Sequence, residues 1–417
     1  MRTPTGRPPA VGFVFVNMLL AVLGFGLVYP VLPALITEFR GGDVAASSHI
    51  YGWIVAIFAV MQFVGAPVLG ALSDHFGRRR VILIATAGAA ADYTLMALAP
   101  SLGWLFVARM IAGLTAGVVG AANAYLVDVT APAQRAQAFG FLGAAFGLGF
   151  VLGPALGGLL GGIDLRLPFW AAAGIAALNC LWGALVLPES LPPERRRRFS
   201  WARANPAGAL LGLREHPVAF GLAGVHLVFW IAQTMLHATW VLYTAHRYAW
   251  ESWQVGLSLA LAGLCSSAVQ AGLVKPILAR IGEKRGVLLG LSLTILFYIA
   301  YGLAPAGWMV YVIIVPAGLA AIAGPAMQTY LSRHVPADEQ GAVQGAFASI
   351  TSVAAILGQP LAAWSFGWAV APGQPGWLQG IAFFEGAALM GLAVALARRT
   401  FRRDAAREAA HERPAVA

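Results

Sequence analysis

Long apolar segments alternate with short polar breaks along almost the whole chain. Each segment has about 20 residues, the length that an α-helix needs to cross a hydrocarbon layer of ~30 Å. Runs such as "VILIATAGAAADYTLMALA" do not alternate polar and apolar residues, so they predict helices and not the strands of a β-barrel. We predict twelve transmembrane helices, at residues 11–36, 50–71, 81–99, 103–126, 138–161, 167–187, 218–243, 252–273, 286–303, 307–330, 342–367 and 378–397.

Composition supports a membrane protein. The chain is 59% hydrophobic and 11% charged, too few polar residues to cover a soluble globule. The first apolar segment is too long for the core of a signal peptide and no small-residue cleavage site follows it, so we expect it to be retained. The preference for Arg over Lys and the abundance of Ala are typical of a GC-rich bacterial genome. We therefore expect an all-α integral membrane protein of the bacterial inner membrane.

The net charge of +10 raises the question of nucleic-acid binding. If the N-terminus is cytoplasmic, 23 of the 27 Lys and Arg fall in the tails and loops of that side. Only Arg40, Arg166 and Arg247 fall in loops on the other side, and Arg109 lies inside a span. This bias sets orientation in the bilayer. It predicts that both termini are cytoplasmic and argues against a nucleic-acid partner.

Signals for enzyme chemistry are missing from the sequence. Cys180 and Cys265 lie far apart inside predicted helices, so they form neither a disulfide framework nor a zinc-binding spacing. The sequence has no GxxxxGK[ST] loop, which argues against ATP as an energy source. We expect no enzymatic activity, no bound cofactor and no metal.

The longest polar connection separates six predicted helices from six. We expect an N-terminal bundle at residues 1–187, a basic cytoplasmic linker at 188–217, and a C-terminal bundle with a cytoplasmic tail at 218–417. The linker contains "PPERRRRFSWARANP" and is suited to anionic lipid headgroups, although it also serves as an orientation signal.

The two halves also match each other at one sequence offset. Gly77 pairs with Gly282 and Gly140 pairs with Gly345, and both pairs are 205 residues apart. Such internal repeats are typical of transporters, in which two halves rock about a central site.

Four motifs follow one another along the chain: "GFGLVYPVLP" (24–33), "GALSDHFGRRR" (70–80), "RMIAGLTAG" (109–117) and "GFVLGPALGG" (149–158). In this order they resemble the major facilitator superfamily, and within it the twelve-helix drug:proton antiporters. "ADYTLMA" and "LSRHVPADEQG" are most similar to the tetracycline-resistance antiporters. The resemblance implies two pseudo-symmetric six-helix bundles and the proton-coupled export of a small amphipathic compound.

The charged loop after residue 71 corresponds to the signature loop of that family. The resemblance implies a gate in which charged side chains latch the cytoplasmic side shut. Its members here are Asp74, Gly77, Arg78 and Arg79, with Asp128 as a second partner. The alternative is that these Arg only set orientation, and we prefer that alternative for Arg80.

Glycines with small-xxx-small spacing mark the fifth predicted helix. They allow two helix backbones to approach closely, and the proline among them introduces a bend. Two interpretations stay open, simple packing and a barrier to leakage between the halves. The residues of this antiporter motif are Gly149, Gly153, Pro154, Gly157 and Gly158.

Three charged residues fall inside predicted spans. A charge at the bilayer centre costs at least ~2.5–3.5 kcal/mol, so we expect each of them to serve a structural or functional role. Asp92 lies near mid-depth, and its carboxyl is the best candidate for a proton carrier. Arg109 keeps its charge, so we expect it to pair with Asp92 or with the substrate. Glu385 is a further candidate for proton coupling.

The chain departs from the tetracycline antiporters at three positions. Ala21 and Thr294 stand where those proteins carry acids, and Ser266 stands where they carry a His. In the family these groups are linked to proton coupling and to the metal–drug complex. Their replacement argues against a magnesium–tetracycline cargo and against the usual coupling route.

Polar groups on the seventh predicted helix offer a replacement. His226, Trp230, Gln233 and His237 share one helical face, so they should face protein or water. We expect this face to line a substrate site, with His237 as a second proton site. Further candidates for lining that site are Asn17, Tyr29, Gln62, Asn123, Gln270 and Gln328.

Three functions therefore remain open. The first is a proton-driven exporter of drug-like compounds that acts as a monomer on a small-molecule substrate. The second is a transporter of one metabolite with the same fold. The third is a membrane scaffold or receptor that transports nothing.

Overall fold

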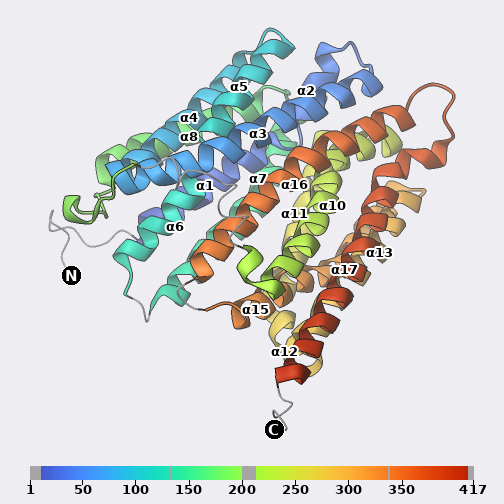
Figure 1. The fold of residues 1–417 in the computed structure, drawn as a ribbon. Coiled ribbons are helices and arrows are strands. Elements are labelled where there is room, and N and C mark those ends of the chain that lie inside the picture. The colour runs from blue at the N-terminus through green and yellow to red at the C-terminus, as the bar shows by residue number, and fades with distance from the viewer. Residues whose placement is uncertain (1–10, 132–133, 200–212, 337–338, 412–417) are drawn as a thin grey trace. The chain divides into compact units, whose positions relative to one another are not determined.

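The computed structural model describes residues 11–131, 134–199, 213–336 and 339–411 (Figure 1). Within these ranges the chain is helical, has no strand, and contains twelve segments long and apolar enough to cross a membrane. The predicted all-α fold with twelve spans is confirmed. Part of the predicted basic linker, at 200–212, lies outside the described residues.

By their internal contacts the residues form two compact units. The first unit comprises Met1–Pro206 and Val241–Gly263, and the second comprises Ala207–Trp240 and Leu264–Ala417. The domain boundaries expected from the sequence stay a prediction.

The described residues of the first half of the chain include eight α-helices. They are α1 (Val11–Val28), α2 (Leu32–Phe39), α3 (Val44–Phe76), α4 (Arg78–Leu98), α5 (Leu102–Leu114), α6 (Val118–Val129), α7 (Arg135–Gly161) and α8 (Leu167–Val186).

Where the structure describes the second half, it has eight more, some joined by short 3₁₀ or π turns. They are α10 (Pro217–Tyr248), α11 (Ser252–Ala268), α12 (Val274–Ile281), α13 (Glu283–Leu303), α14 (Gly307–Ala317), α15 (Ala323–Arg333), α16 (Gln340–Ala369) and α17 (Ile381–His411).

Several helices extend beyond the apolar segments that predicted them. The carboxylate of Asp43 caps α3 by accepting from the Ala46 N–H at 3.0 Å, so this helix begins before its apolar run. The helix α17 continues to His411, past the predicted end at residue 397.

Some spans are interrupted, and the interruptions follow proline and glycine. The first span bends between α1 and α2 at Pro30, and the fourth breaks between α5 and α6 just before Gly117. A π-helical turn at Val269–Leu273 precedes Pro276, whose ring cannot donate a backbone hydrogen bond.

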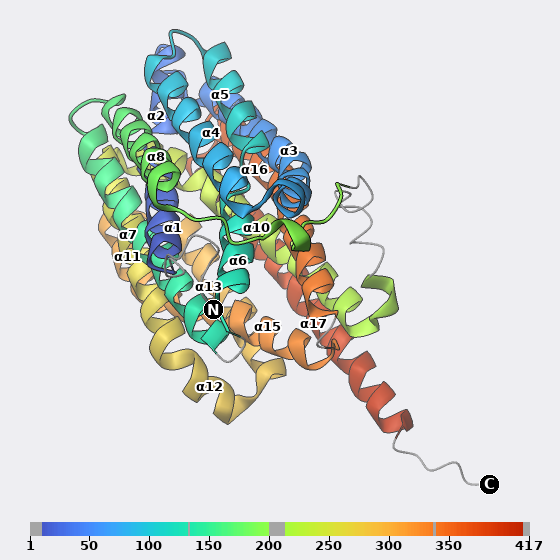
Figure 2. The same ribbon diagram turned by 90° about the vertical axis from the view of Figure 1, so that its left-hand side faces the viewer.

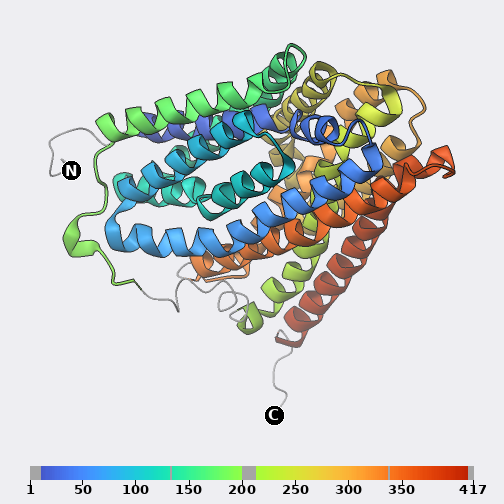
Figure 3. The same ribbon diagram turned by 90° about the horizontal axis from the view of Figure 1, so that it is seen from above.

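Glycines of the antiporter motif allow α7 to pack directly against α1 in the first unit. A Cβ at Gly149 would lie 2.9 Å from the Leu19 carbonyl oxygen, and one at Gly157 would lie 2.2 Å from that of Leu27. Figure 2 shows α1 and α7 side by side, and Figure 3 shows α8 (green) running along α1 (blue). The motif therefore serves close helix packing.

Two other motif residues face a different helix of the same unit. A Cβ at Gly158 would lie 2.4 Å from the Ser252 carbonyl oxygen, and one at Gly256 would lie 2.3 Å from that of Pro154. The small residues of α7 thus hold α1 on one side and the start of α11 on the other.

The second unit uses the same device. A Cβ at Gly358 of α16 would lie 2.6 Å from the Ile231 carbonyl oxygen of α10, and one at Gly290 of α13 would lie 2.6 Å from the Ala323 N. In Figure 1, α17 (red) lies beside α13. Leu291 and Met390 belong to the buried core between these helices.

Candidate functional site

Asp92 of α4 and Arg109 of α5 form an ion pair inside the first unit. Arg109 Nε donates to Asp92 Oδ1 at 3.1 Å, and Arg109 Nη2 donates to the other carboxylate oxygen. The side chains are 7% and 1% exposed, for Arg109 and Asp92 respectively. The structure thus pairs Arg109 with Asp92, one of the two partners that the sequence left open. Each charge offsets part of the desolvation cost of the other.

Close helix packing surrounds the pair. The Arg109 guanidinium lies 5.6 Å from the centroid of the Phe58 ring, a cation–π distance. A Cβ at Gly113 would lie 2.5 Å from the Phe58 carbonyl oxygen, and one at Gly88 would lie 2.2 Å from Thr115 Oγ1. Glycine thus brings α3, α4 and α5 together around the two charges.

The chemistry of the pair links charge to conformation. A guanidinium stays protonated in proteins, whereas a carboxylate can accept a proton. A proton on Asp92 would remove the negative charge that holds Arg109, and Arg109 would then need another anion or a more polar position. The contact between α4 and α5 at this pair therefore depends on the charge of Asp92.

A second charged cluster lies where α3 ends and α4 begins. Arg78 Nη1 donates to Asp74 Oδ1 at 2.6 Å, and Arg78 Nε donates to Asp128 Oδ2 at 3.1 Å. Arg79 Nη2 donates to the Ala184 carbonyl oxygen of α8 at 2.5 Å. The structure brings Arg78 together with Asp74 and Asp128, two of the acids expected at the gate, whereas Arg79 contacts the backbone of α8.

Glu189 completes this cluster and was missed from the sequence. Its Oε1 accepts from the backbone N–H groups of Arg78 at 2.8 Å and Leu191 at 3.1 Å. A carboxylate at the N-terminus of α4 stabilises that helix. Gly77, with φ of 105°, leaves the space for it, since a Cβ there would lie 2.2 Å from Glu189 Oε2. No local pattern marks this contact, because 111 residues separate Glu189 from Arg78.

The polar face predicted on α10 is engaged within the second unit. His226 Nε2 lies 2.9 Å from Thr351 Oγ1 of α16, and its ring centroid lies 4.8 Å from that of Phe347. The Tyr298 hydroxyl of α13 donates to Gln233 Oε1. Trp230 and His237 are partly exposed on the same helix.

Glu385 of α17 accepts a hydrogen bond from Ser365 Oγ of α16 at 2.8 Å and is half-buried. The carboxylate therefore contacts a neighbouring helix.

The predicted amide and aromatic lining residues have different surroundings. Asn17 is 1% exposed, and its Nδ2 donates to Asn179 Oδ1 of α8 at 3.2 Å. Tyr29 lies in the turn between α1 and α2. The others lie on four helical segments: Gln62 on α3 and Asn123 on α6 are partly exposed, and Gln270 in the π-helical turn and Gln328 on α15 are exposed.

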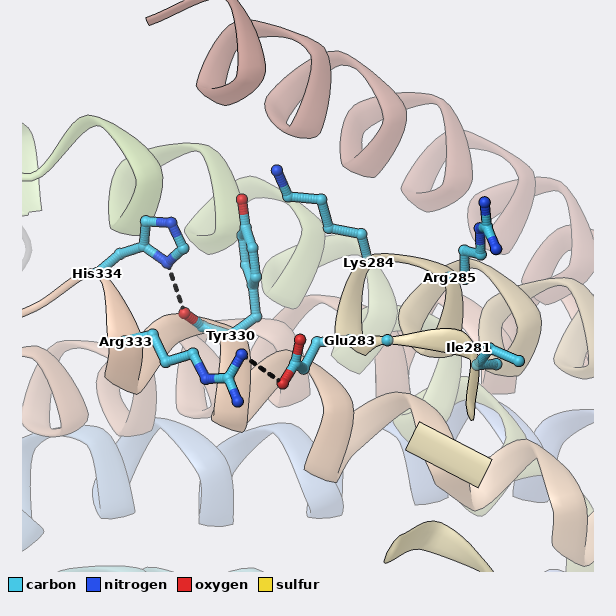
Figure 4. A pocket seen from close by; sticks show the side chains of 8 residues that line it. Ile281, Glu283, Lys284, Arg285, Tyr330, Arg333 and His334 are labelled. Carbon is cyan, nitrogen blue, oxygen red and sulfur yellow. Dashed lines mark hydrogen bonds and ion pairs between the residues drawn. The ribbon is translucent and has the colours of Figure 1, made fainter. Parts of the chain in front are cut away.

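Asp404 is the centre of a charged cluster in the second unit, which the sequence did not reveal. It accepts from the Tyr330 hydroxyl, and its Oδ2 lies 3.2 Å from Lys284 Nζ and 3.5 Å from His334 Nε2. Figure 4 shows Tyr330, Lys284 and His334 around one pocket. Asp404 is only 6% exposed, although it lies past the apolar part of α17.

Among the described residues, no three His, Cys, Asp or Glu side chains lie close enough together to hold a metal ion.

Comparison with known proteins adds to this geometry. The family described as the Major Facilitator Superfamily matches residues 14–359 and, separately, 276–413. The class C tetracycline resistance protein of Escherichia coli is 38% identical over 343 residues, which are 81% of this chain and 85% of that protein. The class G protein of Vibrio anguillarum is 36% identical over 392 residues, 92% of this chain and 95% of that protein.

Among solved structures, the human organic anion transporter MFSD10 (TETRAN) is similar, with 25% identity and a TM-score of 0.69. The match covers 94% of this chain and 100% of the MFSD10 chain. The resemblance inferred from the sequence motifs is confirmed by these matches.

Proposed function

Because the chain belongs to the major facilitator superfamily, we propose that it couples the entry of protons to the export of a small amphipathic compound. It is a multi-pass transporter of the bacterial inner membrane and not an enzyme. The observation that supports the proposal most directly is the buried Asp92–Arg109 pair, a proton acceptor held against a permanent cation. The energy source is the proton gradient, with no further cofactor.

In this proposal a proton enters from the outside and binds a carboxylate oxygen of Asp92. The neutral carboxyl no longer holds Arg109, and α4 and α5 move relative to each other. Loss of the proton to the cytoplasm restores the ion pair and resets the transporter. His237 and Glu385 are further proton sites, and His237→Ala should alter the pH profile of export. An unchanged profile would remove His237 from this role.

The Arg78 cluster acts as the cytoplasmic gate. Asp74 and Asp128 hold Arg78 in one state, and the family resemblance supports their release in another. Both termini lie on this cytoplasmic side, and the monomer is the working unit.

In the second unit, the cargo binds along the polar face of α10. Similarity to tetracycline resistance proteins makes tetracycline the first compound to test. Ala21, Thr294 and Ser266 replace groups that the family resemblance links to proton coupling and to the metal–drug complex, so we favour a different amphipathic cargo.

Proteoliposomes that contain the purified protein and a pH-sensitive dye test this function. With an imposed proton gradient, we expect one compound of a panel that includes tetracycline to drive proton movement and to accumulate uphill. Competition by many unrelated compounds supports drug export, whereas competition by one metabolite alone would indicate a dedicated carrier. Proton movement that no compound changes would contradict the proposal.

A further inference from the structure

Both units contain an ion pair at the same two helix ends, but with acid and base exchanged. In the first unit, Arg78 Nε lies 3.1 Å from Asp128 Oδ2. In the second unit, Arg333 Nη1 lies 2.8 Å from Glu283 Oε1, the contact drawn in Figure 4. Arg78 and Glu283 are 205 positions apart, and so are Asp128 and Arg333. The second pair is the counterpart of the first with reversed polarity.

The backbone around the two pairs supports this equivalence. Gly77 and Gly282 stand one position before each pair's first member, and both have positive φ, 105° and 76°. Each glycine is followed at once by a helix, α4 or α13. Tyr125 and Tyr330 are again 205 positions apart. Each is buried and lies about one helical turn before Asp128 or Arg333, respectively. Because Glu283 stands where the signature loop has Arg78, a sequence pattern that requires a basic residue at this position does not match the second pair.

The Glu283–Arg333 pair contributes little to the stability of the folded protein. Arg333 is 64% exposed, and ion pairs this exposed contribute little to the folded state. The same two helices are already tied to α17 by the buried carboxylate of Asp404, which contacts Lys284 of α13 and Tyr330 of α15. The helices therefore stay together when the exposed pair opens.

The pair also has room to open. Glu283 and Arg333 both line a pocket of about 470 Å³, together with Lys284, Arg285 and His334. Arg333 thus borders open space on this side of the pair.

We propose that Glu283 and Arg333 form a positioning pair for transport, one that opens and re-forms as the second unit changes shape during the cycle. The proposal rests on the transport function proposed above. It predicts an effect on turnover and not on substrate affinity, because neither residue contacts the cargo-lining face of α10.

Charge exchange in the full-length protein tests this role. Glu283→Gln and Arg333→Gln should each lower the maximal rate of gradient-driven uptake about five-fold, the factor by which one exposed ion pair can shift an equilibrium. The probe is tetracycline or ethidium, whichever the unmodified protein carries. KM and the melting temperature should stay unchanged. The double exchange E283R/R333E should restore the rate to within about two-fold of the unmodified protein.

Arg285→Gln is the matched control, since Arg285 is exposed in the same first turn of α13, and it should transport normally. Normal rates in both single variants, or a double exchange no faster than the singles, would overturn the inference. A melting temperature that falls together with the rate would overturn it as well, because it would show that the pair only stabilises the fold.

A cargo-independent measurement separates this inference from the proposed function. If the unmodified protein carries neither probe, the export of such compounds is contradicted. The pair is then tested by maleimide labelling of Ile281→Cys, a half-buried position that lines the same pocket, in a Cys180→Ser/Cys265→Ser background. Glu283→Gln should speed the labelling and E283R/R333E should return it to the original rate. Equal rates in all three proteins would contradict the pair's role.

Discussion

Removing the cation from the buried pair should destabilise the protein far more than removing both charges. Arg109→Gln leaves the Asp92 carboxylate, 1% exposed, without its counter-charge. Loss of one partner of a buried ion pair typically costs about 3–5 kcal/mol. The double variant Asp92→Asn/Arg109→Gln leaves two neutral amides that can hydrogen-bond each other, so we expect its cost to be about 1 kcal/mol. The two substitutions should therefore couple by at least ~2 kcal/mol.

The assay is unfolding in mixed micelles by titration with SDS. Unfolding is monitored by the intrinsic fluorescence of the thirteen tryptophans. Arg285→Gln serves as the control for charge removal at an exposed site and should change the free energy of unfolding by no more than about 0.5 kcal/mol. Equal free energies of unfolding for the single and the double variant would refute the reasoning, because they would show that Asp92 carries no charge that depends on Arg109.

Three further outcomes follow from the charged cluster and the helix packing of the first unit. Asp74→Asn should abolish uptake while membrane insertion, measured by the yield of detergent-extracted protein, stays normal; unimpaired uptake would exclude the latch. Glu189→Gln should lower the free energy of unfolding by about 0.5–2 kcal/mol through weaker capping of α4, and an unchanged SDS midpoint would show that the cap is unimportant. Gly157→Ala places a Cβ 2.2 Å from an α1 carbonyl oxygen and should cost about 1–3 kcal/mol, whereas Gly143→Ala, with open space around it, should cost nothing measurable.

Local properties of the chain were predictable from the sequence. The twelve spans follow from runs of apolar residues, because a helix in a bilayer satisfies its own backbone. The contact between Asp92 and Arg109 follows from the rule that charges inside a membrane find partners. The antiporter-motif glycines were expected to permit close helix packing, and the structure identifies α1 and α11 as the helices that Gly157 and Gly158 meet.

Contacts between distant segments were not predictable. Glu189 caps α4 from a loop more than a hundred residues away, and nothing in either local sequence signals the other. Asp404 lies past the apolar part of its helix, so a hydropathy criterion assigned it to a solvated tail although it is buried. The pair of Glu283 and Arg333 was missed for a related reason, since a motif defined by charge sign fails where the sign is reversed.

The central claim is that Asp92 carries the proton that drives export. Asp92→Asn separates coupling from binding when one protein preparation is measured in two ways: exchange of labelled for unlabelled cargo across proteoliposomes without a gradient, and uphill accumulation with one. Our account predicts that the variant still exchanges cargo, moves no protons and accumulates nothing. Uphill accumulation by Asp92→Asn at the rate of the unmodified protein would contradict it.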